Sequence, residues 1–497
     1  MRLILTSNEM RLLEQRAFAL GAHSLLVMEN AARAAHAELQ NLLGDVNGKD
    51  ILYLIGPGNN GGDGLAMARL CFLTGGRPRV LLTGQPKTPD ALTNLSYVKA
   101  LKIPILEWTQ DEGESIPLPK PDAVVDAVYR TGFHGLLPPP LQRLAGIVNK
   151  WVVPVLAVDT PSGIDCLTGD AEGEIIRASV TVTLGHIKTG LCLCRRLNLI
   201  GELRPVSIGL PPAAYQALES EKLLSALEPG DLKSRLPKRA KNAHKGDCGR
   251  VLLYAGSMGM AGAAGMAAQA ALACLRAGAG LVTIACEEEI IPILQALAPN
   301  AMCIPVRKAV SDPPKYDVFA VGCGLGQSEE IWNNIIALWQ KNTPSVWDAD
   351  ALNMLARHPM VLGEKSVMTP HPGEAARLLG VTAEEVIADP LKAARALYAK
   401  YGGTVVLKGA VSVIDKGEGQ ALNLVGSPAL AKGGSGDALT GIIAALIGQS
   451  PEKSPFEHAR TGCLWHGMAA QEAARQLGVL SPLTSDVISC LGPVSLR

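Results

Sequence analysis

Short apolar runs alternate with helix-like segments along most of the chain. In the first half these runs are typical of strands buried on both faces of a parallel sheet. Helical stretches such as residues 64–75 lie between several of them, and connections of this length between parallel strands form right-handed crossovers. The predicted strands are DILYLIG (50–56), RPRVLLTG (77–84), IPILEW (103–108), AVVDAVY (123–129), VPVLAVDT (153–160) and SVTVTLG (179–185).

The alternation stops and begins again, which predicts two α/β domains. Residues 7–43 precede the first strand and predict one or two helices, with Ser7 or Asn8 as N-cap. The pattern fades near residues 211–227, and a basic, turn-rich segment (228–250) follows. The two halves share no repeat, so we expect two different domains, residues 1–222 and 223–497. The predicted strands of the second half are GRVLLYAG (249–256), LVTIAC (281–286), YDVFAVGCG (316–324), PSVWDADAL (344–352), KSVMTPHP (365–372) and TVVLKGA (404–410).

The composition supports sizeable globular domains and argues against one class of function. Of the 497 residues, 48% are apolar, which is enough for large cores. Lys plus Arg number 46 and Asp plus Glu number 46, so the formal net charge is zero. A nucleic-acid-binding chain usually carries a basic excess, so we expect no nucleic-acid partner.

Three features predict a cytoplasmic protein without a membrane span. The 11 cysteines include no CxxC pair, which favours free thiols in a reducing compartment. The N-terminus lacks the long apolar region of a secretion signal. Residues 251–275 carry no charge, but they are rich in Ala and Gly and begin with the strand-like run VLLYAG. A buried strand followed by a buried helix explains them better than a membrane span.

A glycine-rich segment, GPGNNGGDG (56–64), lies between the first predicted strand and a helix predicted to begin near Leu65. Glycine permits turns with positive φ and close approach of a ligand, and a helix N-terminus attracts anions. The segment does not match the dinucleotide pattern GxGxxG. It predicts a phosphate-binding turn in which Asn59, Asn60 and Asp63 add oxygen atoms suited to a cation. A purely structural turn is the alternative.

Two more strands of this half end in acidic residues. Asp126 lies near the end of AVVDAVY, and Asp159 lies at the end of VLAVD with Ser162 in the next turn. In open α/β sheets, ligands bind outside the carboxyl ends of the strands. Three such ends together predict a cleft.

The motifs GPGNNGGDG, VDAVYRTGFHG and VDTPSGID resemble those of the YjeF N-terminal domain, the NAD(P)HX epimerase, over roughly residues 1–215. The resemblance implies a Rossmann-like three-layer fold, interconversion of the R and S hydrates NADHX and NADPHX, and a potassium ion held by Asn60, Asp126 and Ser162. Inversion at C6 requires proton movement, and we expect Asp159, near the reactive ring, to be the acid/base. Holding the ribose or capping a helix is the alternative for Asp159. The implied substrate contacts are Asn59, Asn60, Gly61, Gly62, Asp63, Arg130, Thr131, Gly132, Phe133, His134, Gly135, Leu136 and Asp159.

In the second half, Gly433, Gly434, Ser435, Gly436 and Asp437 immediately precede a predicted apolar helix, residues 438–447. Such a run aims consecutive backbone N–H groups at one point, where the helix dipole favours an anion. The N–H groups could stabilise a moving phosphoryl group while Asp437 deprotonates the accepting hydroxyl. An ordinary connection with Asp437 as a helix cap is the alternative.

This motif resembles the ribokinase superfamily. The neighbouring motifs HKGDCGRVLLYAGS, VGCGLG, WDADAL, TPHPGEAARLLG and VLKGA narrow the resemblance to the ADP-dependent NAD(P)HX dehydratase, the YjeF C-terminal domain, over about residues 228–495. It implies a ribokinase-like α/β fold. The implied adenine-nucleotide contacts are Lys408, Gly409, Ala410, Val411, Ser412 and Gly436, and the implied contacts to the hydrated dinucleotide are Ala263, Gly324, His371 and Asp437.

The resemblance implies a reaction in which ADP, bound with magnesium, phosphorylates the C6 hydroxyl of the S hydrate. The ring nitrogen then expels phosphate, giving NAD(P)H, phosphate and AMP, with Asp437 as the base for the hydroxyl. Because members of the family tend to assemble, we expect a homo-oligomer. The rival interpretation is a ribokinase-like small-molecule kinase fused to a non-catalytic Rossmann-like interaction domain.

Overall fold

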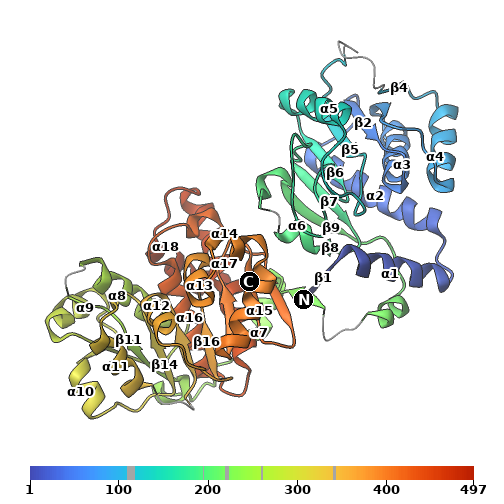
Figure 1. Cartoon of the computed structure of the whole chain (residues 1–497). Helices are drawn as coiled ribbons and strands as arrows, with labels where there is room; N and C mark the ends of the chain where they lie inside the picture. Colours follow the sequence, from blue (N-terminus) through green and yellow to red (C-terminus); the bar gives the residue numbers. More distant parts are fainter. Residues whose placement is uncertain (109–117, 194, 219–222, 259–260, 340–342, 497) are drawn as a thin grey trace. The chain divides into compact units, whose positions relative to one another are not determined.

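The computed structural model describes residues 1–108, 118–193, 195–218, 223–258, 261–339 and 343–496. The chain forms two compact units (Figure 1). Residues 3–223 make the N-terminal unit, and residues 224–497 together with Met1 and Arg2 make the C-terminal unit.

The N-terminal unit is built on a parallel sheet with the strand order β4-β3-β2-β5-β6-β7-β9. All six predicted strands are present within their predicted ranges. A seventh, β9, was not predicted, because its sequence ELRPV is only partly buried and lacks the apolar run of a central strand. The strand bounds are β2 (Asp50–Ile55), β3 (Arg77–Leu82), β4 (Ile105–Glu107), β5 (Ala123–Ala127), β6 (Val155–Val158), β7 (Val180–Leu184) and β9 (Glu202–Val206).

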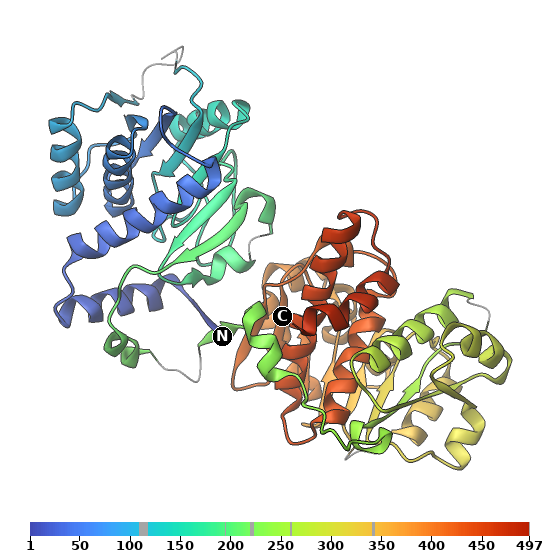
Figure 2. The ribbon, with the colours of Figure 1, turned by 180° about the vertical axis from the view of Figure 1, so that it is seen from behind.

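Helices cover both faces of this sheet, as the views from the two sides show (Figures 1 and 2). Along β2, Tyr53 belongs to the core beneath the first four helices, whereas Leu52 and Leu54 belong to the core beneath α5. This alternation makes the three layers that the sequence predicts. The helices are α1 (Ser7–Ala19), α2 (Ser24–Leu43), α3 (Asn59–Leu73), α4 (Pro89–Ala100), α5 (Pro139–Lys150) and α6 (Thr189–Leu193).

The predicted helical region 7–43 consists of α1 and α2, but its N-cap is Thr6 and neither Ser7 nor Asn8. The Thr6 hydroxyl accepts a hydrogen bond from the Glu9 backbone N–H at 3.2 Å, and the Glu9 carboxylate accepts one from the Thr6 N–H at 2.7 Å. This reciprocal capping box requires Glu three residues after the cap, which only Thr6 has. The strand before it, β1 (Arg2–Leu5), pairs in parallel with β8 (Ile187–Lys188), with Leu5 opposite Lys188.

The sheet of the C-terminal unit has the order β13-β12-β11-β14-β15-β16-β17-β18-β19-β10. It is parallel from β13 to β17, and β17, β18 and β19 form an antiparallel meander. The six predicted strands are present, whereas β10, β13, β18 and β19 were not predicted. The bounds are β10 (Leu224–Ala226), β11 (Arg250–Tyr254), β12 (Leu281–Cys286), β13 (Met302–Pro305), β14 (Val318–Val321), β15 (Ser345–Trp347), β16 (Ser366–Met368), β17 (Thr404–Leu407), β18 (Ser412–Asp415) and β19 (Gln420–Asn423).

Helices α8, α16, α17 and α18, with single residues of α7 and α9, enclose one large apolar core on one face of this sheet. The uncharged segment 251–275 is the strand β11 followed by α8, as predicted. Among the described residues, no helix combines the length and the apolar character that crossing a membrane requires. The helices are α7 (Leu232–Arg235), α8 (Ala261–Arg276), α9 (Ile291–Leu297), α10 (Val306–Ser311), α11 (Glu329–Leu338), α12 (Ala349–Arg357), α13 (Pro372–Leu379), α14 (Ala383–Ala388), α15 (Pro390–Tyr401), α16 (Ser435–Gln449), α17 (Pro455–Leu477) and α18 (Thr484–Ser495).

Candidate functional sites

A cavity of about 640 Å³ opens in the N-terminal unit beside the carboxyl ends of β2 and β5. The order of the sheet reverses between these two strands, which is where open α/β sheets bind ligands. The lining comes from the turn after β2 and the loop after β5, and it comprises Pro57, Gly58, Asn59, Asn60, Val128, Tyr129, Arg130, Gly132, Phe133, His134, Leu136 and Pro138.

The segment Asn59–Asp63 forms the first turn of α3, so the helix begins six residues before the predicted start at Leu65. None of its glycines has a positive φ, so the predicted turn with positive φ is wrong. The glycines permit close packing. A Cβ on Gly61 would lie 2.0 Å from the Gly56 carbonyl oxygen, and one on Gly64 would lie 2.5 Å from the Ala127 Cβ. The helix N-terminus is thereby held against the strand ends, with its free N–H groups beside the cavity.

Asn60, Asp126 and Ser162, the three predicted potassium ligands, lie together below the cavity. The Ser162 hydroxyl donates to Asp126 Oδ1 at 2.6 Å and accepts from the Tyr129 N–H at 3.0 Å. Asn60 Nδ2 donates to the Tyr129 carbonyl at 2.7 Å, while Asn60 Oδ1 is buried without a hydrogen-bond partner. Burial raises the pKa of Asp126 to about 6, despite hydrogen bonds from Ser162. A cation at this point would satisfy the free Asn60 oxygen and favour the ionised form of Asp126.

Asp159 follows β6 with a φ of +68°, a conformation that few non-glycine residues adopt. Its Oδ1 accepts hydrogen bonds from the Leu184 N–H at 2.9 Å and from the Lys188 ammonium, and its Oδ2 accepts one from Arg130 Nε at 2.8 Å. Burial favours the neutral acid, but Lys188 and Arg130 outweigh it and lower the pKa of Asp159 to about 2. A carboxylate held in this way is a weak base, which argues against the acid/base role expected for Asp159.

Asp63 is buried among the same charged groups, but its pKa shifts in the opposite direction. Burial raises its pKa to about 7; Arg130 and Lys188 oppose the increase, and Asp159 and Glu14 add to it. A carboxyl group with this pKa can both accept and release a proton near neutral pH. Two of the charged groups around Asp63, Glu14 and Lys188, were not predicted as site residues. Glu14 accepts a hydrogen bond from Arg130 at 2.8 Å, and Lys188 is fully buried. Neither residue lies in a motif, and their contacts depend on chain segments far apart in the sequence.

The predicted substrate loop, Arg130 to Leu136, forms the rim of the cavity. Arg130 is fixed by its two ion pairs, and the Phe133 ring stacks on Tyr129 with 5.0 Å between centroids. Gly132, Gly135 and Leu136 are exposed. The loop therefore begins at a fixed cation, Arg130, and continues into exposed residues that a ligand can contact.

In the C-terminal unit, Gly434 is the N-cap of α16 and has a φ of +89°. A Cβ at this position would lie 1.8 Å from Gln269 Oε1. The helix begins at Ser435, three residues before the predicted start, so Asp437 lies inside the first helical turn and not just before it. Burial and the neighbouring Asp348 raise the pKa of Asp437. The backbone N–H groups at a helix start lack the carbonyl partners of the helix interior and can bind an anion; at this start the Ser435 N–H already donates to the Lys432 carbonyl at 3.4 Å.

Asp348 and Lys408 lie beside this helix start. The Lys408 ammonium donates to Asp348 Oδ1 at 2.7 Å, and the Thr440 hydroxyl donates to Asp348 Oδ2 at 3.0 Å. Burial alone would lower the pKa of Lys408, but Asp348 and Glu374 outweigh it and raise that pKa. A Cβ on Gly436 would lie only 3.1 Å from Lys408 Nζ. The absence of a side chain at Gly436 thus leaves a cation next to the anion-binding turn.

Residues Lys408 to Ser412, the predicted nucleotide contacts, span the tight turn between β17 and β18. The Lys408 N–H donates to the Pro370 carbonyl at 2.8 Å, which places this turn beside the one that carries His371. Gly409 and Ala410 are exposed and Val411 and Ser412 are partly exposed, so a nucleotide can reach them.

His371 is the N-cap of α13. Its Nδ1 accepts hydrogen bonds from the Gly373 and Glu374 N–H groups, and its Nε2 lies 3.4 Å from Glu374 Oε1. Burial, followed by Lys408 and Arg377, lowers the pKa of His371, and burial raises the pKa of Glu374 to about 7. The neutral ring therefore carries its proton on Nε2 and can donate it to a ligand.

Ala263 and Gly324, the two other predicted contacts of the dinucleotide, touch each other. Gly324 has a φ of +58°, and a Cβ on it would lie 2.8 Å from Ala263 Cα. The thiol of the preceding residue, Cys323, lies within 4.8 Å of a carboxylate oxygen of Asp437. Neither Cys323 nor Asp348 was among the predicted site residues, although Asp348 follows a predicted strand in the way that Asp159 does.

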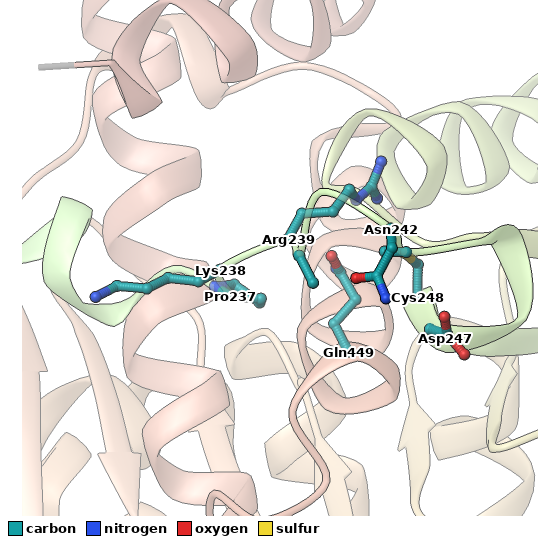
Figure 3. A pocket seen from close by; sticks show the side chains of 9 residues that line it. Pro237, Lys238, Arg239, Asn242, Asp247, Cys248 and Gln449 are labelled. Atoms are coloured by element: carbon teal, nitrogen blue, oxygen red, sulfur yellow. The ribbon is translucent and has the colours of Figure 1, made fainter.

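The basic connector has a cavity of its own, of about 310 Å³, shown in Figure 3. Arg239 donates to the Gly278 carbonyl at 2.7 Å, and Gln449 Nε2 donates to the Ala277 carbonyl at 2.9 Å. These groups satisfy carbonyls just beyond the C-terminal end of α8, where cations are favoured. Lys238 points away from the other labelled side chains, and the carboxylate of Asp247 also lines the cavity. The contacts indicate a structural role for this segment.

Comparison with known proteins places both units in one family. The NAD(P)H-hydrate dehydratase family matches residues 251–492, and the family of YjeF-related protein N-termini matches residues 24–190. A bifunctional NAD(P)H-hydrate repair enzyme of Coxiella burnetii is 36% identical over 499 residues, which cover 98% of each chain. The chain belongs to the bifunctional NAD(P)H-hydrate repair enzymes.

Another member of this family and two solved structures agree with the assignment. The repair enzyme of Escherichia coli is 35% identical over 456 residues, 88% of this chain and 84% of its own. An ADP/ATP-dependent NAD(P)H-hydrate dehydratase from Bacillus subtilis, co-crystallised with ATP and Mg²⁺, is 31% identical and has a TM-score of 0.50. The match covers 55% of this chain and 98% of that one. A ribokinase-like superfamily protein from Enterococcus faecalis also matches with a TM-score of 0.50 at 26% identity, covering 55% of this chain and 95% of its own. The predicted family and α/β folds are confirmed.

Proposed function

We propose that this repair enzyme works through two separate sites, one in each unit. The N-terminal cavity interconverts the R and S hydrates of NAD(P)H, and the Asp437 site converts the S hydrate to NAD(P)H. Each site contains its own acidic group, its own cations and its own helix N-terminus, all drawn from a single unit. The observation that carries the proposal is the placement of Asp437 in the first turn of α16 beside Lys408.

At the C-terminal site, the phosphoryl donor is ADP, which enters with magnesium and lies along residues 408–412. Asp437 removes the proton from the C6 hydroxyl while the N–H groups at the start of α16 and the Lys408 ammonium stabilise the charge on the transferring phosphoryl group. The oxygen of the hydroxyl bonds to phosphorus, and AMP leaves. The ring nitrogen lone pair then breaks the C6–O bond and releases phosphate, and loss of a proton from C5 of the resulting iminium gives NAD(P)H.

The rest of that site positions the hydrated dinucleotide. Ala263 and Gly324 have no bulk beyond a Cβ, so the dinucleotide can approach the backbone closely. His371 is exposed, and its Nε2–H is a neutral hydrogen-bond donor. These roles rest on the arrangement of the three residues around Asp437.

At the N-terminal site, we assign the acid/base role to Asp63 in preference to Asp159. Burial raises the pKa of Asp63 to about 7, whereas Lys188 and Arg130 lower the pKa of Asp159 and keep it ionised. Asp159 then serves as a fixed negative charge that orients Arg130 at the mouth of the cavity. The residues from Asn59 to Gly62 and from Arg130 to Leu136 contact the dinucleotide.

Potassium fits the cluster formed by Asn60, Asp126 and Ser162. The free, buried Asn60 Oδ1, the Asp126 carboxylate and the Ser162 hydroxyl are hard oxygen donors of the kind that such cations bind. When bound, the ion supplies a positive charge below the cavity, near the start of α3.

The test is to follow NADH formation and the R to S ratio in one mixture of NADHX isomers with ADP. The chain should form NADH from both isomers and release phosphate and AMP. A small-molecule kinase fused to a non-catalytic interaction domain would instead leave the R isomer unchanged and accumulate a stable phosphorylated product. Self-association and a cytoplasmic location stay predictions from the sequence.

A further inference from the structure

Cys323 occupies an unusually constrained place beside Asp437. It follows β14 and lies between Gly322, with a φ of +121°, and Gly324, with a φ of +58°. A Cβ on Gly322 would lie 1.9 Å from the Asp348 carbonyl oxygen. The Cys323 carbonyl accepts a hydrogen bond from the Gly256 N–H at 3.0 Å. These restraints fix the direction of a fully buried thiol.

That thiol faces two carboxylates. The Cys323 Sγ and one oxygen each of Asp348 and Asp437 all lie within 4.8 Å of one another. Both oxygens of Asp348 already accept hydrogen bonds, from Lys408 and Thr440. Beside Asp437, the Cys323 thiol and the Asp437 backbone N–H each lower the pKa of the Asp437 carboxyl group, as nearby donors do.

We propose that Cys323 is a positioning residue for the dehydratase reaction: its S–H donates to Asp437 and holds this carboxylate ionised and in place. The inference rests on the proposed role of Asp437 as the base. An ionised carboxylate accepts a proton from the C6 hydroxyl, whereas a neutral one cannot. Because Asp348 repels the Asp437 charge at close range, a donor beside Asp437 decides whether the base is available.

The groups around Asp437 define the expected pH effect. Asp348, at the end of β15, raises the pKa of Asp437, and Lys408, at the end of β17, lowers it. Glu374 on α13 raises the pKa of Lys408, and Lys408 in turn lowers the pKa of His466 on α17. Removing the thiol takes away a hydrogen bond that lowers the pKa of Asp437, so more of the base is neutral at any given acidic pH.

The test compares the pH profiles of kcat/KM for dehydration of S-NADHX in Cys323→Ala, Cys323→Ser and wild type, with full-length protein and ADP. In Cys323→Ala, the acidic limb should move to higher pH, with about a tenfold loss on that limb and recovery at alkaline pH. Cys323→Ser retains an O–H donor and should restore the wild-type profile. Cys274→Ala is the control, since Cys274 lies buried in the same apolar core.

An equal loss at every pH in Cys323→Ala, or a Ser variant as impaired as the Ala variant, would overturn the inference, because both indicate a packing effect. Epimerisation measured on the same preparations reports whether the N-terminal site is intact. The variant Asp437→Asn distinguishes a failure of the proposed role of Asp437 from a failure of the proposed role of Cys323. If it dehydrates normally, the proposed role of Asp437 fails; if it is inactive but Cys323→Ala shows an unshifted limb, only the role of Cys323 fails.

Discussion

The fully buried ammonium of Lys188 donates a hydrogen bond to Asp159, and the same carboxylate accepts a second one from Arg130. Lys188 also donates to the Thr183 hydroxyl and the Leu184 carbonyl. One negative charge is thus enclosed by two cations. Because its charge is held by these two cations, Asp159 is a poor proton acceptor, and its role is to hold Arg130 in place in the N-terminal site.

Replacing Asp159 should therefore lower stability. Asp159→Asn leaves the Lys188 charge buried without a carboxylate, and breaking a buried pair costs about 3–5 kcal/mol. The lowered pKa of Asp159 means that its contribution is present above the unfolded value of about 3.9 and lost as pH falls towards about 2. Denaturant unfolding should show a loss in free energy at pH 7 that shrinks in acid.

The double variant Asp159→Asn with Lys188→Met provides the control for that prediction. It removes the stranded charge and should regain part of the lost free energy. Equal stability of Asp159→Asn and wild type at pH 7 would contradict the ion-pair account.

Asp63→Asn should abolish the pH dependence of epimerisation near neutrality. The loss of a general acid/base reduces the rate by about 10²–10⁴-fold, and the wild-type profile should contain an ionisation near pH 7 that the variant lacks. The measurement is the initial rate of R to S conversion between pH 5 and pH 9, with Asp170→Asn, an exposed substitution, as the matched control. A wild-type profile that persists in Asp63→Asn would refute the assignment.

The epimerase rate should no longer depend on potassium when the Asn60 side-chain oxygen is removed. In Asn60→Ala, replacing potassium by a bulky organic cation should no longer alter the epimerase rate, whereas wild type should slow. Potassium should also lower the pKa of Asp126, which burial raises to about 6. Thermal unfolding with and without potassium gives a second readout: wild type should gain stability from the ion and Asn60→Ala should not. Equal stabilisation of both proteins would place the ion elsewhere.

Gly434 should be intolerant of a side chain. In Gly434→Ala, both the φ of +89° and the overlap with Gln269 Oε1 are unfavourable, and the strain from the backbone alone is about 1–2 kcal/mol. Dehydration should fall because the start of α16 shifts. Adding Gln269→Ala removes the overlap and should recover part of the stability measured by denaturant unfolding. A Gly434→Ala protein with wild-type stability and activity would show that this turn is not rigid.

The sequence is most informative where chemistry and chain position coincide. Asp126 and Asp159 could be found because they follow apolar strands, and Asp437 because three glycines and a helix surround it. Lys188 and Glu14 could not be found, since each acts through residues brought to it by the fold. The glycines of residues 56–64 mark the turn in the sequence, but none of them has the predicted positive φ, and their lack of a side chain permits close packing of α3 against the strand ends.

The most direct test of the two-site account is a time course of NADH formation from an equal mixture of R- and S-NADHX with ADP, run with wild type, Asp437→Asn and Asp63→Asn. Wild type should convert both isomers. Asp437→Asn should form no NADH yet still equilibrate R and S, and Asp63→Asn should rapidly convert only the S half. Loss of both activities from either single substitution would contradict the account.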